Sequence, residues 1–457
     1  MTTLKNCAIS HNIHQKSIRL PRGTLDLTYK TSPSHPYELE DLLDFAQRIN
    51  PKRAFLFVSK VLGRHIPVAP HTMRRAFTDL ANLLPNDLPQ PILVIGMAET
   101  AVGLSAGVHQ ALQTRYPDAL LLNSTRHAQH ATADTINDND AALFATFSED
   151  HSHASQHLIY QSADKITQAQ VRASKTLIMV DDEASTGNTC VNVVTALRDA
   201  GLDQLQQVHL STLVDWSLTL NDKDNDTQNQ AEDATKNSTD SIAARLPAID
   251  FYRHHLLAGA WQWTDAPHPA PIMMPSVDTT EAGSQPLGNT GHWGRFPTVD
   301  STNGFAHYLH RFQKAFAHFN HLDNSNQQAA FDSTNLPQKI LVLGSNEFVW
   351  LPFLLAEWLE KETQIPSAQI PSAQIKSTQT LSVVKFSALT RSPIALGAAI
   401  TTMLSFADNY GLGMTNFVYN VTPSDWDLIV LCVETASDSV DELWKDLDNV
   451  LVVGADR

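Results

Sequence analysis

The sequence predicts an α/β protein built around a parallel sheet that is flanked by helices. Two stretches, Pro91–Leu112 and Leu177–Gly201, have the order of an apolar strand, a short loop and an amphipathic helix. A third apolar run, Ala119–His127, ends in polar residues. Strands that alternate with helices are typical of parallel sheets, whose ligands bind beyond the carboxyl ends of the strands. We therefore expect these polar strand ends to face one site.

The length of 457 residues is too great for one hydrophobic core, so we expect two domains. The first should span residues 20–218 and the second residues 291–457. Residues 219–290 should form a low-complexity insert and linker, because residues 221–241 contain no aromatic or large aliphatic side chain. Within that linker, residues 246–263 are apolar and aromatic enough to pack against the protein.

Two shorter patterns lie near the start of the chain. GTLDLTYKT (residues 23–31) alternates in the manner of an edge strand, and YELEDLLDFAQRIN (residues 37–50) has helical spacing. We expect one strand and one helix from them.

The composition excludes several classes of protein. The 32 basic and 48 acidic residues give a net charge of −16, which disfavours a non-specific nucleic-acid binder. Three cysteines without metal spacing are typical of a reducing compartment. Neither a signal peptide nor an apolar run of membrane-spanning length is evident, so we expect a cytoplasmic protein without a membrane partner.

The stretch with the clearest chemistry is LIMVDDEASTGNT, residues 177–189. Backbone N–H groups in a tight loop that opens a helix favour a phosphate, and Gly187 lets the backbone approach it closely. Thr186 and Thr189 add hydroxyl donors. Asp181 and Asp182 can accept hydrogen bonds from two neighbouring sugar hydroxyls or hold Mg²⁺ through water. These features together indicate a ribose 5-phosphate site.

Other phosphate-binding motifs fit less well. The chain contains neither G-x-G-x-x-G nor G-x-x-x-x-G-K-[ST]. A haloacid-dehalogenase-type site requires Asp-x-Asp after the strand, whereas Glu183 occupies the third position.

The stretch resembles the phosphoribosyl pyrophosphate motif of type I phosphoribosyltransferases, in which two acidic residues precede Thr-Gly-x-Thr. The resemblance implies that Asp181 and Asp182 hold the ribose 2- and 3-hydroxyls, with Mg²⁺ as cofactor. It also implies a 5-phosphate loop, formed by Ser185, Thr186, Gly187, Asn188 and Thr189. Some purine-specific members place an Asp where this chain has Ser185. A general acid or base must then come from Glu99, Glu183, a histidine or the substrate.

The same resemblance assigns the pyrophosphate side of the site. The loop after the strand that ends at Gly96 would handle pyrophosphate through Met97, Ala98, Glu99 and Thr100, and such loops commonly have an unusual peptide geometry. A plain helix cap is the alternative for this loop. Arg126 would clamp pyrophosphate oxygens, although a solvated surface arginine fits its position as well.

A histidine-rich stretch, residues 149–157, precedes the phosphate-binding motif. Its position corresponds to the mobile loop that closes over substrate in type I enzymes and excludes water. A transition-metal site and a solvated polar loop are the alternatives.

The C-terminal part contains SALTRSPIALG (residues 387–397), and together with GRFPT (residues 294–298) it resembles the TRSP domain. That domain follows a phosphoribosyltransferase domain in a bacterial family associated with tellurium-resistance operons. The resemblance implies a phosphoribosyltransferase in a nucleotide-like biosynthetic or stress-response pathway.

An internal comparison suggests a duplication. LVIGMAETAVGLSAGVHQAL (residues 93–112) aligns with LVLGSNEFVWLPFLLAEWLE (residues 341–360), and each is followed by a strand that ends in Thr-Arg. LIMVDDEASTG (residues 177–187) aligns with LIVLCVETASD (residues 428–438), in which Glu434 ends an apolar strand. We hypothesise that the TRSP domain is a degenerate copy of the first sheet. Its polar residues Glu347, Arg391 and Ser392 would form a second site or complete the first one.

The sequence therefore predicts a Mg²⁺-dependent enzyme that transfers ribose 5-phosphate from phosphoribosyl pyrophosphate to a nucleobase-like acceptor and releases pyrophosphate. Glu99, Arg126, Asp181 and Asp182 are the candidate catalytic residues. A non-catalytic phosphoribosyl pyrophosphate-binding regulator is the alternative. The acceptor, the direction of the reaction and self-association into a homodimer are left open.

Overall fold

A computed structural model describes nine segments of the chain. They are residues 12–31, 37–48, 53–127, 143–148, 156–218, 241–275, 290–319, 331–364 and 382–455.

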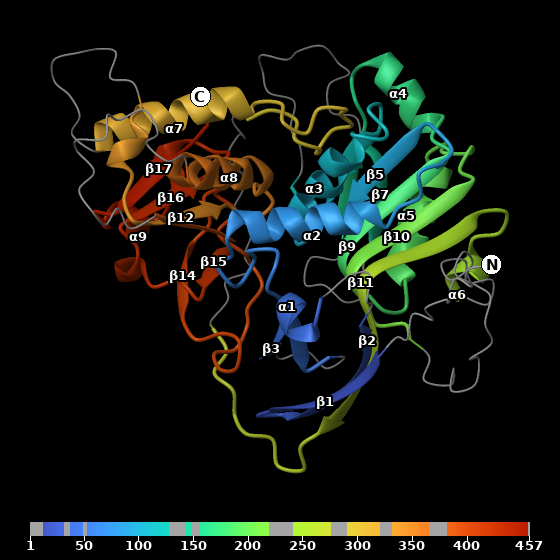
Figure 1. Cartoon of the computed structure of the whole chain (residues 1–457), viewed down its shortest axis with the longest axis horizontal. Coiled ribbons are helices and arrows are strands. Elements are labelled where there is room, and N and C mark those ends of the chain that lie inside the picture. The colour runs from blue at the N-terminus through green and yellow to red at the C-terminus, as the bar shows by residue number, and fades with distance from the viewer. Residues whose placement is uncertain are drawn as a thin grey trace, which may run out of the picture.

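The elements fall into an N-terminal half and a C-terminal half (Figure 1). The N-terminal half contains β1 (Asn12–Leu20), β2 (Gly23–Thr31), α1 (Leu39–Leu42), β3 (Leu43–Gln47), β4 (Phe55–Ser59), α2 (Pro70–Asn82), β5 (Ile92–Gly96), α3 (Val102–Leu112), β6 (Leu120–Asn123), β7 (Leu143–Ser148), β8 (Gln156–Tyr160), α4 (Lys165–Arg172), β9 (Thr176–Ala184), α5 (Asn188–Asp199), β10 (Gln207–Asp215), α6 (Ser241–Arg245) and β11 (Asp250–Asp265). The C-terminal half contains α7 (Phe305–Phe319), η1 (Ser333–Asn335), β12 (Lys339–Gly344), α8 (Trp350–Gln364), β13 (Val383–Ala388), β14 (Met403–Ala407), β15 (Thr415–Tyr419), η2 (Pro423–Asp425), β16 (Leu428–Cys432), η3 (Ser437–Ser439), α9 (Glu442–Lys445) and β17 (Val450–Val453).

The N-terminal half is organised around a seven-stranded sheet with the order β1-β2-β11-β10-β9-β5-β6. The five strands from β11 to β6 are parallel, and β1 and β2 form an antiparallel hairpin beside β11. Strands β5 and β9 are buried on both faces because helices cover both sides, which explains their continuous apolar sequences. The predicted α/β fold with a parallel sheet is confirmed.

Three local expectations were different in the structure. Strand β2 lies between β1 and β11, so it is an interior strand and β1 is the edge. Residues 37–50 were expected to form a helix, but α1 ends after one turn and the chain continues as β3, which pairs with β4. Residues 246–263 were expected within a linker, yet most of them form β11, which pairs with β10 and β2 and completes the first sheet. Apolar pattern alone did not reveal these pairings with distant strands.

The C-terminal half contains a four-stranded parallel sheet with the order β13-β12-β16-β17. This order is the same as β6-β5-β9-β10 in the first sheet. Each half also has a two-stranded antiparallel ribbon at the same point of its chain, β7-β8 after β6 and β14-β15 after β13. The ribbons are attached alike, because Thr125 bridges to Leu158 of β8 and Thr390 bridges to Phe417 of β15. These agreements support the duplication hypothesis.

The strand register aligns the two halves residue by residue. Gly96 pairs with Asn123 and Val180, whereas Gly344 pairs with Ala388 and Cys432. Thr125 follows Asn123 by two residues, and Thr390 follows Ala388 by two residues. Thr125 and Arg126 are therefore equivalent to Thr390 and Arg391. The same count makes Asp182 equivalent to Glu434. The sequence alignment had placed Glu434 opposite Glu183, which is wrong by one position.

The two halves exchange short segments. Val68, which precedes α2, forms both backbone hydrogen bonds of a bridge with Phe386 of β13, at 2.9 and 2.8 Å. Thr298, which precedes α7, does the same with Leu121 of β6, at 3.0 and 2.8 Å. Leu121 and Phe386 are equivalent positions on the edge strands of the two sheets. Each edge is therefore extended by the other half.

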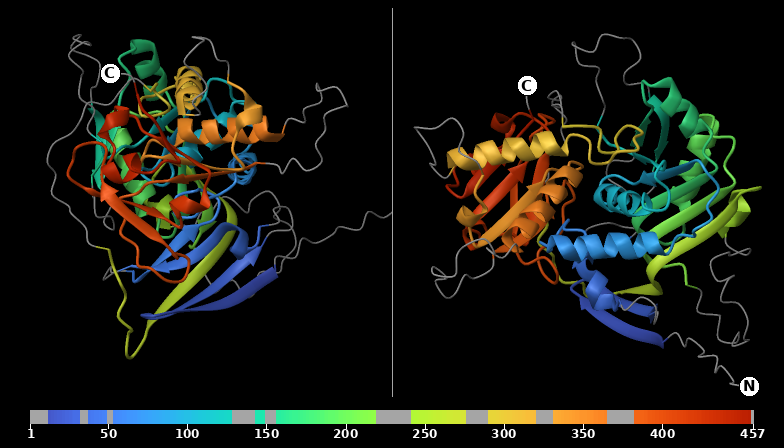
Figure 2. Two further views of the ribbon diagram at one scale, coloured as in Figure 1. Left: turned by 90° about the vertical axis from the view of Figure 1, so that its left-hand side faces the viewer. Right: turned by 45° about the horizontal axis from the view of Figure 1, so that its top comes forward.

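One hydrophobic core joins the halves. Helices α2, α3, α7 and α8 contribute to a single cluster with the inner faces of both sheets, through residues such as Phe77, Leu104, Phe312 and Phe353. Figure 2 shows α2 and α3 between the two sheets, with α7 lying over the C-terminal sheet. Separate clusters cover the outer faces. None of the helices in the described segments has the length and apolar character that crossing a membrane requires.

Candidate functional site

The acidic strand end and the loop after it form one pocket. Strand β9 extends through Asp181, Asp182 and Glu183 to Ala184, and helix α5 starts at Asn188. A pocket of about 140 Å³ lies against this turn, lined by Met179, Asp181, Glu183, Ala184, Ser185, Thr186, Gly187, Asn188, Thr189, Cys190, Asn192 and Leu210. The loop and Asp181 therefore lie around one pocket, whereas Asp182 is not among the residues that line it.

Gly187 shapes the turn between the strand and the helix. Its φ of 68° lies in the left-handed region, and it forms the N-cap of α5. A Cβ atom here would lie 1.9 Å from Cδ1 of Ile242 in α6, so another residue would have to displace that side chain as well as adopt the left-handed backbone. The turn leaves the N-terminus of α5 beside the pocket, where backbone N–H groups and the helix dipole favour an anion.

Helix α6 supports the loop from outside. Arg245 donates to Oδ1 of Asn188 at 2.8 Å and to the carbonyl oxygen of Thr186 at 3.3 Å. The side chain of Arg253 on β11 is ion-paired with Asp215 at 2.9 Å, and both side chains are buried. Sequence reasoning identified neither arginine, because both follow the low-complexity segment.

Asp182 is held in an environment that disfavours its charge. Burial is the main cause that raises the pKa of Asp182, and the neighbouring carboxylate of Glu183 raises it further. Asp182 forms no ion pair among the described residues. A cation or hydroxyl donors at this position would therefore be stabilised by its carboxylate.

Glu183 has a different environment from its two neighbours. Arg53 binds its carboxylate with both terminal nitrogens, at 2.7 and 3.2 Å, and Trp216 donates an indole N–H at 3.1 Å. Arg53 also stacks over Phe55 and Phe57, with its guanidinium carbon 4.9 and 4.6 Å from the ring centroids. Glu183 was a candidate general base, but these contacts hold it as a structural ion pair.

The loop after β5 lies beside the end of β9. Met97 donates its backbone N–H to the carbonyl of Val180 at 3.3 Å, and Ala98 donates to Oγ of Ser124 at 3.0 Å. The peptide bond between Ala98 and Glu99 is cis, so the loop has the unusual peptide geometry that we expected. Met97 and Ala98 are buried, while Glu99 and Thr100 are half-buried.

Glu99 forms an ion pair with Arg64, a residue that no sequence motif identified. Nη1 of Arg64 lies 2.9 Å from Oε1 of Glu99, and Nη2 donates to the Glu99 carbonyl oxygen at 2.6 Å. Only 4% of Arg64 is exposed. Basic residues at the margin of an apolar segment are usually solvated, but Arg64 is buried.

The strand end after β6 contacts the C-terminal half directly. The Glu347 carboxylate accepts the hydroxyl hydrogen of Thr125 at 2.5 Å and the backbone N–H of Arg126 at 2.7 Å. Arg126 itself is half-buried. His157, from the expected lid, is buried against Phe147 and lies 3.0 Å from Oγ of Ser124. The rest of the histidine-rich stretch, residues 149–155, lies outside the described residues.

The C-terminal half has a buried ionic cluster where the N-terminal half has its acidic strand end. Arg295 binds Glu434 with both terminal nitrogens, at 2.8 and 3.0 Å, and lies 3.4 Å from Glu347. Tyr410 donates its hydroxyl to Glu434 at 2.8 Å. Burial alone would raise the pKa of Glu347, but His127, Arg295 and the hydrogen bonds at Thr125 and Arg126 lower it to about 2. Glu347 is therefore ionised, and both of its carboxylate oxygens have hydrogen-bond partners within the protein.

Arg391 and Ser392, the other residues expected at a second site, lie beside this cluster. Arg391 directs one terminal nitrogen to Nε2 of His127 at 2.8 Å and the other to the sulfur of Met414 at 3.3 Å. Burial is the main cause that lowers the pKa of His127, while the nearby Glu347 carboxylate opposes this shift. Ser392 donates its N–H to Thr390 and accepts a hydrogen bond from Tyr419. Glu347 and Arg391 thus contact the N-terminal half, whereas these hydrogen bonds of Ser392 lie within the C-terminal half.

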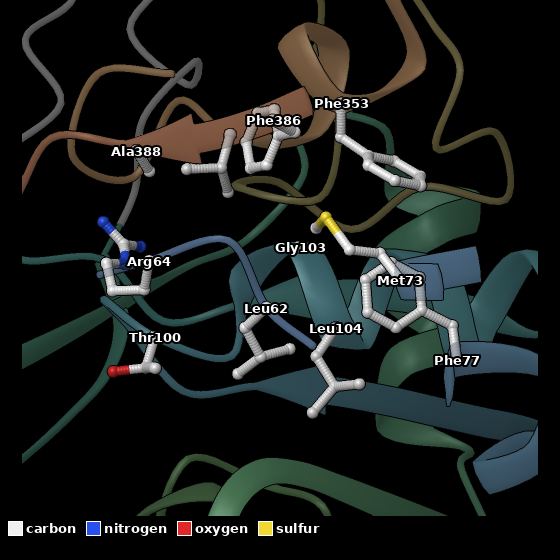
Figure 3. Close-up of a pocket in the computed structure, with 11 residues that line it drawn as sticks. Leu62, Arg64, Met73, Phe77, Thr100, Gly103, Leu104, Phe353, Phe386 and Ala388 are labelled. Carbon is white, nitrogen blue, oxygen red and sulfur yellow. The ribbon is translucent and has the colours of Figure 1, made fainter. Parts of the chain in front are cut away.

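A small cavity lies at the same interface, between the loop after β5 and the C-terminal half. Figure 3 shows Arg64 between Thr100 and Ala388, with the apolar side chains of Leu62, Met73, Phe77 and Phe386 around the space. Its volume of about 10 Å³ is close to that of one water molecule. The halves are therefore closely packed beside the loop.

These features define a class of protein: an α/β domain of the type I phosphoribosyltransferase fold, fused to a second, related α/β sheet. Residues 42–245 match the family described as "Phosphoribosyl transferase", and residues 310–450 match the "TRSP domain C terminus to PRTase_2". The chain belongs to this family, with a phosphoribosyl transferase domain followed by a TRSP domain. No curated protein sequence matches the chain.

Several solved structures are similar to part of the chain at low identity. Adenine phosphoribosyl transferase from Trypanosoma brucei, in complex with AMP, pyrophosphate and ribose-5-phosphate, is 13% identical with a TM-score of 0.27, over 44% of this chain and 75% of that one. Adenine phosphoribosyltransferase from Rhodothermus marinus is 12% identical with a TM-score of 0.27, over 47% of this chain and 94% of that one. Orotate phosphoribosyltransferase from Aeropyrum pernix is 15% identical with a TM-score of 0.25, over 47% and 84%.

Proposed function

We propose that the protein transfers ribose 5-phosphate from phosphoribosyl pyrophosphate to a nucleobase-like acceptor with release of pyrophosphate. The observation that carries the proposal is the pocket at the end of β9, where Asp181 lies against the Gly187 turn. Ser185, Thr186, Gly187, Asn188 and Thr189 would bind the 5-phosphate, and Asp181 and Asp182 would bind the ribose hydroxyls. Membership of the phosphoribosyl transferase family supports this assignment.

The leaving pyrophosphate would lie beside the loop formed by Met97, Ala98, Glu99 and Thr100, within reach of Arg126. Catalysis would consist mainly of positioning the substrate and neutralising charge around a sugar cation that develops at C1. With Glu183 fixed by Arg53, the candidates for a proton transfer are Glu99, a histidine of the 149–157 stretch and the acceptor itself.

Mg²⁺ fits the donor set as a substrate-bound ion. Among the described residues, no three His, Cys, Asp or Glu side chains are grouped as a metal site. Asp181 and Asp182 supply the excess negative charge that a hydrated cation offsets, and Mg²⁺ usually keeps water and phosphate ligands. The ion would neutralise pyrophosphate charge as it leaves.

The test is a pyrophosphate-release assay with phosphoribosyl pyrophosphate, Mg²⁺ and a panel of purine and pyrimidine bases, beside calorimetric titration of phosphoribosyl pyrophosphate alone. Binding together with base-dependent pyrophosphate release supports the transferase. Binding without release on any base supports the alternative regulator. Absence of binding at millimolar ligand contradicts both. The family that the sequence resembles is associated with tellurium-resistance operons. The panel should therefore also contain nucleobase-like acceptors other than the common purines and pyrimidines.

A further inference from the structure

Arg64 connects the pyrophosphate loop to the C-terminal half. Besides its two contacts with Glu99, its Nη1 donates to the backbone carbonyl oxygens of Asn346 at 2.8 Å and Leu389 at 2.9 Å. Asn346 belongs to the loop after β12, and Leu389 follows β13. One buried guanidinium therefore joins a strand-end loop of the first sheet to two strand-end loops of the second.

Arg64 has a counterpart in the C-terminal half. Both Arg64 and Arg295 follow a glycine with positive φ, and both precede the segment that pairs with the other half's edge strand. Both terminal nitrogens of the Arg295 guanidinium group bind Glu434, which is equivalent in position to Asp182. Arg64 instead directs its terminal nitrogens to Glu99 and to the carbonyl oxygens of Asn346 and Leu389. This difference keeps Asp182 available for a ligand.

We propose that Arg64 is a positioning residue of the pyrophosphate loop and that the C-terminal half holds it in place. The inference rests on the proposed function. Without Arg64, the half-buried carboxylate of Glu99 would lose its ion-pair partner beside the proposed pyrophosphate position, where like charges repel. The Nη2 contact also fixes the Glu99 carbonyl, and with it the direction of the loop's backbone N–H groups. The TRSP domain is thereby part of the catalytic machinery although its own acidic strand end is occupied.

The experiment compares two ligands by calorimetric titration in the presence of Mg²⁺: ribose 5-phosphate and phosphoribosyl pyrophosphate. Ribose 5-phosphate needs only the end of β9 and the Gly187 turn, whereas phosphoribosyl pyrophosphate also needs the loop at Glu99. In the full chain, Arg64→Gln should weaken phosphoribosyl pyrophosphate at least tenfold and leave ribose 5-phosphate within twofold. Arg75→Gln is the matched control, because Arg75 lies exposed on α2 and its side chain is 65% exposed. It should change neither affinity.

Two further variants separate positioning from folding. Arg64→Lys keeps the charge but loses the fork, so it should give an intermediate loss for phosphoribosyl pyrophosphate alone. The double variant Arg64→Gln/Glu99→Gln removes the uncompensated carboxylate and should regain part of the lost affinity. If Arg64→Gln does not fold, Arg64→Lys and the double variant provide the comparison.

The outcomes distinguish the two proposals. If the unmodified protein binds neither ligand, the proposed function fails. If it binds both and the Arg64 variants weaken both ligands equally or neither ligand, the proposed function stands and the role of Arg64 is overturned. Absence of any recovery in the double variant would also contradict charge neutralisation by Arg64.

Discussion

Asp182 and Glu434 occupy equivalent positions at the carboxyl ends of the two sheets, yet only Glu434 has an arginine bound to it. Arg295 and Tyr410 fill the hydrogen-bonding capacity of Glu434, whereas burial and Glu183 raise the pKa of Asp182. Loss of the charge of Asp182 should therefore affect catalysis, whereas loss of the charge of Glu434 should affect the stability of the fold.

Asp182→Asn should weaken catalysis strongly without weakening the fold. It removes a half-buried charge that the fold disfavours, so the melting temperature should stay the same or rise. We expect kcat/KM to fall by at least about 100-fold, equivalent to about 2.7 kcal/mol of transition-state stabilisation. Steady-state kinetics and thermal unfolding measure the two effects. A large loss of stability with normal kinetics would contradict the assignment of Asp182.

Glu434→Gln should do the reverse. It leaves Arg295 buried beside a neutral group, and breaking a buried ion pair typically costs about 3–5 kcal/mol. Chemical denaturation of the full chain measures this loss, and titration of ribose 5-phosphate with the folded variant should give an unchanged affinity. Weaker ribose 5-phosphate binding at full stability would assign a ligand to the second sheet.

Gly187→Ala should prevent phosphate binding by distorting the turn. The left-handed backbone alone costs about 1–2 kcal/mol with a Cβ atom, and the contact with Ile242 adds to it. Gly397→Ala is a matched control, because Gly397 has a φ of +112° and no atom within 4 Å of an added Cβ. Both variants should lose stability, but only Gly187→Ala should lose ribose 5-phosphate in calorimetry. Equal affinities of the two variants for ribose 5-phosphate would contradict binding of the phosphate at the Gly187 turn.

The stability of the protein should fall in mild acid because of buried histidines. His209 and His254 share a hydrogen bond of 2.9 Å on neighbouring strands, and burial lowers their pKa values to about 3 and about 4. Their stabilising contribution is complete above the unfolded pKa of about 6.5 and is lost as pH falls toward the folded values. Each contributes up to about 1.4 kcal/mol per pH unit in that window. Urea unfolding at pH 7.5 and 5.5 measures the slope, which His209→Gln/His254→Gln should reduce.

Glu347 should contribute to the attachment of the two halves through Thr125. The pKa of Glu347 is lowered to about 2, so its contribution is complete above the ordinary carboxyl range and is lost as pH falls toward 2. A double-mutant cycle with Glu347→Gln and Thr125→Val should give a coupling energy of about 1–2 kcal/mol at pH 7. A coupling near zero would mean that the hydrogen bond contributes nothing to stability.

The sequence revealed those parts of the site that are local in the chain. The strand-turn-helix around Gly187 could be predicted because its apolar run, turn residues and helix start are consecutive. Arg64 could not be selected in that way, since its acceptor at Leu389 lies 325 positions away. The register of the second sheet was also missed by one residue. Strands such as β9 and β16 are apolar on both faces, so their sequences carry no alternation that would fix the alignment.

The exchanged bridges at Val68 and Thr298 have a consequence for dissecting the protein. A fragment that ends before residue 290 would leave Leu121 on an open sheet edge, and a fragment that starts there would do the same to Phe386. Each fragment would also expose its share of the common core. The two halves should therefore unfold in a single cooperative transition, and fragments expressed alone should aggregate through their bare strand edges.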